Sequence, residues 1–277
     1  VLTTQERGHA ADLARLATQE HEALTVVTLG GDGTAAEAAG ALVGTGAALA
    51  PMPTGSTNVF ARTIGWPMQP RLAIDRLVDA LARGQHAAPV TIGHVEAGEE
   101  ERFFIVNAGV GIDAEAADLV ERHPQWKKRV GQAWFASATA LAAARQWRRP
   151  LMRVAIDGGT PFPLASISVA CTRPYAYFRS RPFDLIPDAG HEGALGWLGA
   201  VSRGLGGPAV AAAGAFTGAW HLGSSRVAHG MATESIIIDD GDGVALQADG
   251  EALGRHRRIV MRPATGLLVL RGDGLTA

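Results

Sequence analysis

The sequence predicts an α/β protein in two parts, a doubly wound parallel sheet followed by a β-rich, largely antiparallel part. Three observations lead to this fold class. Short β-branched or apolar runs alternate with helical patterns near the N-terminus, and after Pro89 most of the chain changes to short β-rich runs. The composition, 47% hydrophobic and 6% aromatic, is typical of a globular protein. We place the division at residues 1–88 and 89–277.

Helices and strands alternate in the first part. Apolar residues recur at helical spacing over 5–20, and the run TVVTL over 25–29 predicts a strand. The segment 35–43 is helical in composition, 46–53 predicts a second short buried strand, and 70–83 again shows helical spacing. Because a helix separates the two strands, we expect them to lie parallel in one sheet.

The second part is dominated by short strands separated by Gly, Asp or Pro. Helical patterns interrupt it at 125–147 and 207–222. Because no low-complexity linker separates the two parts, we expect them to pack directly and to form a cleft that holds the active site. The expected strands are VTIGHVEA (90–97), RFFIVNAGVGI (102–112), MRVAID (152–157), LASISVAC (164–171), SIIIDD (235–240), VALQADGE (244–251) and RRIVMR (257–262).

Charge and cysteine content exclude several classes of protein. The formal net charge of -2 provides no basic field for nucleic acid, so we expect no nucleic-acid partner. The single cysteine, Cys171, lies in an apolar run and predicts a small buried strand residue in a reducing, cytoplasmic setting. No apolar stretch reaches the roughly 18 residues that a membrane-spanning helix needs.

The sharpest local feature is the loop Gly30-Gly31-Asp32-Gly33-Thr34, between a predicted strand and a predicted helix. Glycines let the backbone turn tightly and approach phosphate oxygens, and the N-terminus of the next helix favours an anion. Thr34 adds a hydroxyl donor. Because like charges repel, Asp32 should act through a metal ion, through a ribose or acceptor hydroxyl, or on the loop itself.

A second loop rich in small and hydroxyl residues, Gly55-Ser56-Thr57-Asn58, follows the next predicted strand. Carboxyl ends of parallel strands meet at one edge of a sheet, where ligands bind in open α/β folds. We therefore expect the two loops to lie side by side. The pair is far more specific than either loop alone, since a single glycine-rich turn is often an ordinary connection.

A third feature is Asp249-Gly250-Glu251, at the end of a predicted strand. Two carboxylates flanking a glycine can hold a metal or take a proton from a hydroxyl. The alternative is a solvated hairpin tip, which such a turn often forms.

Taken together, these motifs resemble the diacylglycerol kinase catalytic family, which includes bacterial lipid kinases, sphingosine kinases and ceramide kinases. The resemblance implies an ATP-binding α/β domain related to those of NAD kinase and phosphofructokinase, a β-rich lipid domain, and magnesium-dependent transfer of the γ-phosphate to a lipid hydroxyl. Diacylglycerol, giving phosphatidic acid, is the preferred acceptor, and a sphingoid base or ceramide is the alternative. The landmarks are GGDGT (30–34), PTGSTNVFAR (53–62), NAGVGIDAEA (107–116), KKRVGQAWF (127–135), PDA (187–189) and ADGE (248–251).

The resemblance also implies roles for single residues. Asp32 and its glycine loop, with Gly55 to Asn58, would hold ATP. Asp249 and Glu251 would serve Mg²⁺ and proton chemistry, and Asp113 would face the lipid headgroup. Whether Asp32 or Asp249 is the general base stays open, because phosphoryl transfer asks mainly for positioning and charge neutralisation.

Four departures from the family pattern stand out. Val59 replaces a frequent Asp, and His191-Glu192 stands where bacterial members carry an acidic pair tied to a structural magnesium. The run TRPYAY over 172–177 replaces the usual Asn-led run, and the family's opening strand and Asn-Pro loop are not found before Val1. If the natural protein starts at Val1, we expect ATP binding to be weakened.

The segment 125–147 has basic ends, tryptophans and an apolar middle, which suits a helix at a membrane surface. A core helix covering the second part is the alternative. We expect a lipid-alcohol substrate and transient contact of a peripheral, cytoplasmic protein with the membrane, and we leave a homodimer open.

Two rival functions remain open at this point. NAD kinases also carry GGDGT, although the loop ending in FAR and the late DGE favour a lipid acceptor. The second rival is a catalytically inactive module that binds nucleotide or lipid, which Val59 and His191-Glu192 motivate.

Overall fold

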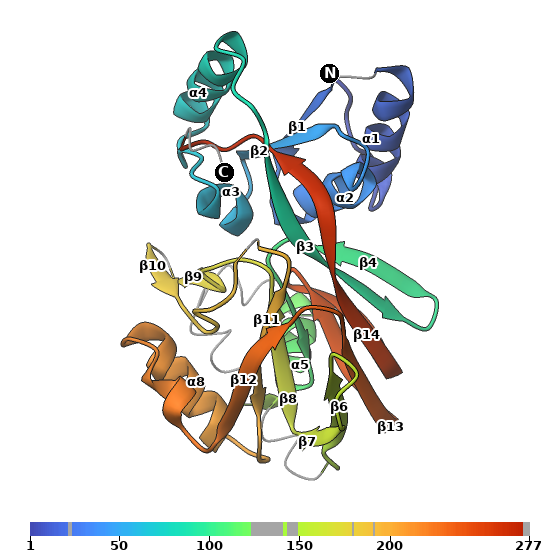
Figure 1. Ribbon diagram of the computed structural model, residues 1–277, viewed down its shortest axis with the longest axis vertical. Helices are drawn as coiled ribbons and strands as arrows, with labels where there is room; N and C mark the ends of the chain where they lie inside the picture. The colour runs from blue at the N-terminus through green and yellow to red at the C-terminus, as the bar shows by residue number, and fades with distance from the viewer. Residues whose placement is uncertain (22–23, 123–140, 143–148, 179, 191, 274–277) are drawn as a thin grey trace.

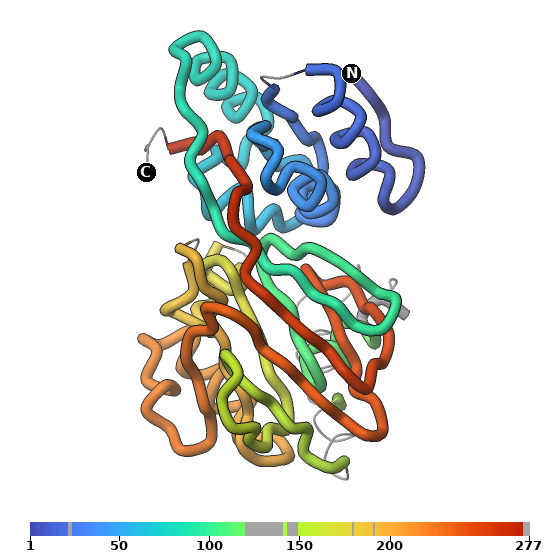
Figure 2. The backbone as a smooth tube through the Cα atoms, turned by 45° about the vertical axis from the view of Figure 1, so that its right-hand side comes forward, coloured from blue at the N-terminus to red at the C-terminus, as the bar shows by residue number. Residues whose placement is uncertain are grey.

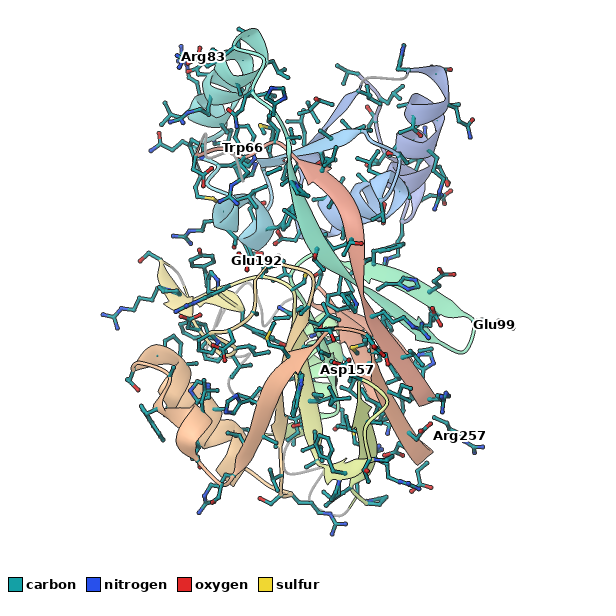
Figure 3. All side chains as sticks on the ribbon, in the orientation of Figure 1. Trp66, Arg83, Glu99, Asp157, Glu192 and Arg257 are labelled. Atoms are coloured by element: carbon teal, nitrogen blue, oxygen red, sulfur yellow. The ribbon has the colours of Figure 1, made fainter. Side chains whose placement is uncertain are left out.

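In the computed structural model, two parts are stacked along the longest axis and joined by long strands (Figure 1). The structure describes residues 1–21, 24–122, 141–142, 149–178, 180–190 and 192–273. A backbone trace turned by 45° shows the same two parts, with the C-terminal end of the described chain back in the upper one (Figure 2). Trp66 and Arg83 lie in this upper part, and Asp157 and Arg257 lie in the lower one (Figure 3).

The upper part is the predicted alternation of helices and parallel strands. The strands β1 and β2 pair in parallel from Thr25 opposite Ala48 to Gly30 opposite Pro53. Both strands therefore end at the same edge, immediately before their loops. The elements are α1 (His9–Glu20), β1 (Thr25–Gly30), α2 (Asp32–Leu42), β2 (Ala48–Pro53), α3 (Val59–Thr63) and α4 (Pro70–Ala82).

Two helix starts differ from the prediction. Helix α1 begins at His9 because Gly8 has φ 86, a left-handed conformation outside a helix. Helix α2 begins at Asp32, inside the glycine loop, and its N-cap is Gly31. The short helix α3 was not predicted, since a five-residue helix is too short to show a period.

The lower part is β-rich, as predicted. Its helix α8 and the short 3₁₀ helix η1 correspond to the predicted helical segment 207–222, which the structure extends by one residue at each end and interrupts after Phe216. The elements are β3 (Ala88–Ala97), β4 (Glu100–Phe104), β5 (Asn107–Val110), α5 (Ile112–Arg122), β6 (Met152–Ile156), β7 (Phe162–Leu164), β8 (Ser166–Ala170), β9 (Ala176–Phe178), β10 (Arg181–Phe183), β11 (Leu195–Ala200), α8 (Gly206–Phe216), η1 (Trp220–Gly223), β12 (Val227–Ala232), β13 (Ile236–Ala248) and β14 (Glu251–Val269).

The prediction was wrong in several details of this part. Helix α5 begins at Ile112, where a strand was expected, because Gly111 at φ 89 ends the extended run. The runs 235–240 and 244–251 form one irregular strand, β13, followed by a turn. Strands β9 to β12 were not predicted. The expected helix at 125–147 lies outside the described residues, apart from 141 and 142.

One twelve-stranded sheet runs through both parts. Its main path is β1-β2-β14-β13-β5-β8-β11-β12, while β3 pairs with β14. The end of β14 lies between β2, with which it pairs in parallel, and β3, with which it pairs antiparallel. The last strand of the chain thus completes the sheet of the first part. The division of the chain between residues 88 and 89 stays a prediction. Strand β14 comes later in the sequence than this division, yet it pairs with strands of both parts.

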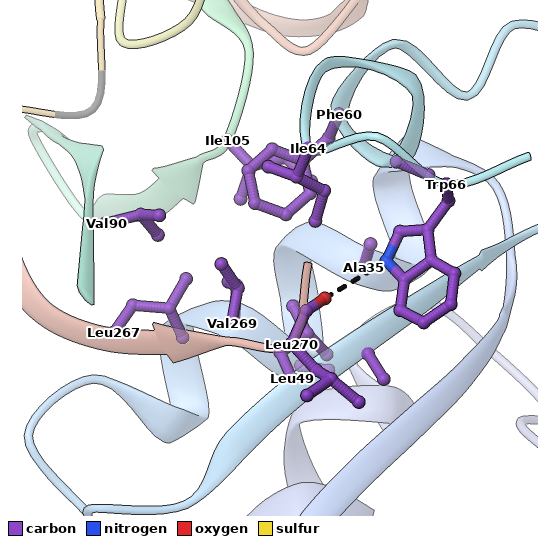
Figure 4. Close-up of a cluster of buried hydrophobic side chains, with 14 of the residues drawn as sticks. Ala35, Leu49, Phe60, Ile64, Trp66, Val90, Ile105, Leu267, Val269 and Leu270 are labelled. Carbon is purple, nitrogen blue, oxygen red and sulfur yellow. Dashed lines mark hydrogen bonds between the residues drawn. The ribbon is translucent and has the colours of Figure 1, made fainter. Parts of the chain in front are cut away.

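The core of the upper part contains residues from both ends of the chain (Figure 4). Leu49, Phe60 and Leu267 are fully buried in it. The indole N–H of Trp66 donates to the carbonyl of Leu270 at 3.1 Å, a bond that spans 204 positions. Among the residues that the structure describes, no helix is long and apolar enough to cross a membrane.

Candidate active site

The two small-residue loops meet at the edge where β1 and β2 end, as expected. The carbonyl of Gly30 accepts the N–H groups of Thr54 and Gly55 at 3.3 and 3.1 Å. A Cβ built on Gly55 would come 2.5 Å from the Cα of Gly31, well inside van der Waals contact. Only residues without side chains allow this approach, which explains why both loops carry glycine here.

The N-terminus of α2 provides the anion-binding groups at this edge. The first bond of the helical ladder runs from Ala35 N–H to Gly31 O, so the amides of Asp32, Gly33 and Thr34 precede the ladder. Thr34 lies beside Gly30, since a Cβ built on Gly30 would come 2.7 Å from the Thr34 hydroxyl. These amides and the positive end of an 11-residue helix favour a phosphate group.

Asp32 acts on the second loop. Its carboxylate accepts the N–H groups of Val59 and Phe60, each at 3.0 Å, and the Thr57 hydroxyl at 3.5 Å. Asp32 thereby caps the N-terminus of α3 from across the loop. Burial raises the pKa of Asp32, although these hydrogen bonds oppose the rise. Of the three sequence-based alternatives for Asp32, the structure shows the action on the loop.

Asn58 shapes the second loop. It has φ 47 and is 4% exposed. Its side chain accepts the N–H of Gly55 at 2.9 Å and donates to the Gly55 carbonyl at 2.8 Å. Ser56 and Thr57 are exposed. The loop therefore presents exposed hydroxyl groups to a ligand, while Asn58 fixes its shape from below.

Asp249 lies in the turn between β13 and β14, with φ 48. Its carboxylate accepts the N–H groups of Ile105, Val106 and Asn107 at 2.9, 2.9 and 3.1 Å. Burial raises its pKa to about 7; the three amides oppose this rise, and the charge of Asp32 adds to it. The interpretation as a solvated hairpin tip is wrong for Asp249, because its side chain folds inward over these amides.

Glu251 connects this turn with the first loop. Its carboxylate lies 2.6 Å from a guanidinium nitrogen of Arg102 and 3.4 Å from one of Arg7. A Cβ built on Gly33 would lie 3.5 Å from a Glu251 oxygen, so the carboxylate sits over the first turn of α2. Neither arginine was predicted as a site residue, because a single Arg in a strand or near a terminus is not part of any recognisable motif.

A cleft of about 560 Å³ brings these groups together. Its lining comes from the start of α1, from α2, from β4 and from the turn between β13 and β14. Gly33, Asp249 and Glu251 line it, and so do Arg7 and Arg102. Within the described part of the chain, Gly55 to Asn58 and Asp32 lie outside this lining. The expected cleft between the two parts is thus present, with Asp249 inside it.

Asp113 lies in the first turn of α5. Its carboxylate accepts the Tyr175 hydroxyl at 2.6 Å and the Gln247 side-chain amide at 2.9 Å. Gln247 in turn accepts the N–H of Gly250 at 2.8 Å. Burial raises the pKa of Asp113. The network joins Asp113 to the Asp249 turn through one side chain.

Neither Tyr175 nor Gln247 was predicted. A signal was present for Gln247, since it is a polar residue at a buried position of the run VALQADGE and is 2% exposed. Tyr175 gave none, because the segment that carries it departs from the family pattern.

Comparisons with known proteins agree with this geometry. The family model described as the diacylglycerol kinase catalytic domain matches residues 1–90. The predicted resemblance is confirmed. No curated protein matches this chain.

Solved structures similar to the chain carry the same family name. One from Bacillus anthracis str. Sterne, described as a diacylglycerol kinase, is 17% identical with TM-score 0.63, over 98% of this chain and 84% of its own. Two more from that strain, provisionally assigned as diacylglycerol kinases, are 19% and 20% identical, with TM-scores of 0.71 and 0.66. Each covers 98% of this chain, which covers 83% and 85% of theirs. At such identities the likeness shows the fold, and the predicted fold class is confirmed.

Diacylglycerol kinase resemblance implies ATP and usually a divalent metal, and the residues here fit both. The close approach of Gly31 and Gly55 leaves bare backbone that a phosphate group could approach. Within the described ranges, no cluster of three or more His, Cys, Asp or Glu residues forms a metal site. Mg²⁺ commonly uses one or two carboxylates together with phosphate oxygens and water. Glu251 and Asp249 suit that arrangement better than a cage made of protein ligands alone.

Proposed function

We propose that this chain is a lipid kinase that transfers the γ-phosphate of ATP to a lipid hydroxyl, and that its acceptor is diacylglycerol. One observation carries the proposal: the carboxylate of Glu251 lies over the N-terminus of α2 and Asp249 lines the same cleft, although both residues lie more than 200 positions downstream. A glycine-rich helix start and two acidic groups are the parts that magnesium-dependent phosphoryl transfer requires.

The residues divide the work by position. The amides at the start of α2, together with the Gly55 loop, hold the phosphates of ATP. Glu251 would hold Mg²⁺, which would supply charge neutralisation when bound. Arg7 and Arg102 lie beside Glu251 and offer further positive charge to the phosphates.

Asp249 is our choice for the general base. A general base works best with a pKa near the working pH, and its pKa is about 7. Asp249 lines the cleft, whereas Asp32 lies outside the lining and caps α3. Asp249 therefore takes the proton of the acceptor hydroxyl, and Asp32 holds the two loops together.

The acceptor side is supported by the network below the cleft. Asp113, Tyr175 and Gln247 are linked to the Asp249 turn by hydrogen bonds. A polar group held there is well placed to orient a lipid headgroup. A sphingoid base or a ceramide carries similar hydroxyl groups and is the second candidate acceptor.

The test follows labelled γ-phosphate from Mg-ATP to a panel of diacylglycerol, sphingosine, ceramide and monoacylglycerol. We expect labelled phosphatidic acid, and a rate lower by roughly 100-fold or more in Asp249→Asn, because general-base catalysis contributes about 10²–10⁴-fold. Asn suits position 249, since it tolerates φ 48.

Asp239→Asn is the matched control, because Asp239 lies on β13, the strand that precedes the Asp249 turn, and forms an exposed ion pair with Arg258. It should keep the wild-type rate. Label on sphingosine or ceramide alone would show that the acceptor is one of these lipids and not diacylglycerol. ATP binding without any labelled lipid would favour the inactive binding module.

A further inference from the structure

An exposed aromatic patch lies on the hairpin of β9 and β10 and on α8. Phe178 on the hairpin is 41% exposed, and Phe216 at the end of α8 is 45% exposed. Their ring centroids lie 5.6 Å apart in an edge-to-face arrangement. Trp220, 51% exposed, donates its indole N–H to Thr217 at 2.7 Å, which holds it against the end of α8.

Hairpin and helix form one unit. The N–H of Asp184, just after β10, donates to the carbonyl of Ala215 in α8 at 3.1 Å. Phe183 packs on Phe216 with ring centroids 5.0 Å apart. Both views of the backbone show the hairpin next to α8 on one side of the lower part (Figures 1 and 2).

The charges around this patch have a clear pattern. Residues 204–225 contain no Asp, Glu, Lys or Arg, although they include an exposed helix face. Arg203 and Arg226 flank this segment, and Arg181 lies on the hairpin; all three are exposed. Among the residues that the structure describes, none of these three arginines has a carboxylate within ion-pairing distance. The nearby Asp184 is already paired with Arg173 at 2.6 Å.

Another exposed apolar face, on helix α4, differs in this respect. Helix α4 exposes Ile74 and Val78, but these alternate with charges of both signs, from Arg71 and Asp75 to Arg83. Such a mixture is typical of a solvated helix face. The patch on α8 instead combines aromatic side chains with three exposed arginines, and the nearby Asp184 carboxylate is neutralised by Arg173. Aromatic and basic side chains together are the pattern of a surface that binds at the interface of an anionic bilayer.

The patch is continuous with the candidate acceptor site. Phe183 contacts Phe216 on one side and Tyr175 on the other, with centroids 6.4 Å apart in the second pair. Tyr175 donates its hydroxyl to Asp113. A row of aromatic rings therefore leads from the exposed surface to the buried network below the cleft.

We propose that Phe178, Phe216 and Trp220, with the rim of Arg181, Arg203 and Arg226, dock this chain on an anionic bilayer surface. The inference deepens the proposed function, on which it rests, because a lipid acceptor must be taken from a bilayer. In the docked chain, the row of aromatic rings would run from the membrane surface to Tyr175. The residues of this surface are not part of the segment 125–147, which the sequence suggested for membrane contact.

The test is flotation of the full chain with vesicles of phosphatidylcholine containing about one third phosphatidylglycerol, without ATP. We expect the wild type to float and Phe178→Ser/Phe216→Ser to bind at least roughly tenfold more weakly, since two aromatic side chains would no longer enter the apolar part of the bilayer. Arg203→Gln and Arg226→Gln should each weaken binding about fivefold, because one arginine near an anionic surface contributes about 1 kcal/mol.

Ile74→Ser/Val78→Ser is the matched control, with two side chains 47% and 58% exposed on α4, and it should float like the wild type. Thermal melting and circular dichroism check that each variant is folded. The proposal is overturned if the wild type stays unbound, if Phe178→Ser/Phe216→Ser floats normally, or if the α4 control loses binding equally. It is also overturned if sedimentation shows that the patch joins two copies of the chain in place of vesicles.

This experiment separates docking from catalysis. If the wild type phosphorylates a water-soluble short-chain diacylglycerol but does not bind vesicles, the docking proposal is wrong and the proposed kinase activity stands. If it binds vesicles through the patch and labels no lipid, docking stands and the proposed kinase activity is wrong.

Discussion

Two aspartates in left-handed turns show how burial decides a carboxylate's proton affinity in this molecule. Asp157, φ 47, accepts N–H groups from residues 233–235 and the Thr233 hydroxyl; burial pushes its pKa upward, but the donors outweigh it and the pKa is lowered. Asp249, φ 48, also accepts three amides, yet its deeper burial prevails and its pKa rises to about 7. Three backbone amides bond each carboxylate, yet the two pKa values shift in opposite directions.

A raised pKa predicts a pH dependence of stability. Asp249 binds its proton more tightly in the folded chain than in the unfolded one, so its favourable contribution is complete below the unfolded pKa of about 4 and is lost as pH rises through about 7. We expect the free energy of unfolding of the wild type to fall between about pH 4 and 7, and to fall less in Asp249→Asn. Urea denaturation at several pH values measures both slopes.

Asp239→Asn serves again as the control and should keep the wild-type slope, because Asp239 is an exposed partner of Arg258. Equal slopes in the wild type and Asp249→Asn would contradict the assignment of this titration to Asp249. The pH dependence of stability has the opposite sign for Asp157. Because its pKa is lowered, Asp157 contributes stability that is lost as the pH falls below about 4.

At the scale of elements, the approach of two loops makes the candidate nucleotide site. Helix α3 has five residues, too few to be stable alone, and Asp32 caps it from the neighbouring loop. The sequence predicted that the loops would be neighbours, because each follows a parallel strand. It did not predict that Asp32 would connect them, since that contact depends on α3.

Gly55→Ala tests this approach. The added methyl group would meet the Cα of Gly31 and the Asn58 side chain at 2.5 and 2.8 Å, and so force the loops apart. Since overpacking costs about 1–3 kcal/mol, we expect ATP to bind roughly ten- to hundredfold more weakly by calorimetry. Gly241→Ala is the control, because a methyl group there meets no atom within 4 Å. Unchanged ATP affinity in Gly55→Ala would show that the loops do not form the phosphate site.

At the scale of the whole molecule, β14 couples the two parts. Its residues pair with β13 and β3 in the lower part and with β2 in the upper one. Leu267 and Val269 are fully buried in the upper core, although they lie near the C-terminal end of the described chain. The upper part therefore cannot complete its core from residues 1–88 alone.

Leu267→Ala is expected to lower the free energy of unfolding by about 2–4 kcal/mol, since it leaves a cavity in this shared core. We expect a single urea transition, followed by tryptophan fluorescence and by circular dichroism. Leu16→Ala, with a side chain 49% exposed on α1, should change stability by no more than about 0.5 kcal/mol. Two separate transitions would argue against the coupling through β14.

The sequence by itself determined the fold class, the loops and the carboxylate motif, because strand and helix periods and glycine-rich turns are local properties of the chain. Only the tertiary structure decided that Asp249 folds inward, that Glu251 lies over α2 beside Arg7 and Arg102, and that Tyr175 and Gln247 join Asp113. These contacts link residues from 62 to more than 200 positions apart. No local pattern encodes such pairs, since they depend on how β14 returns through the sheet and on which groups burial then brings together.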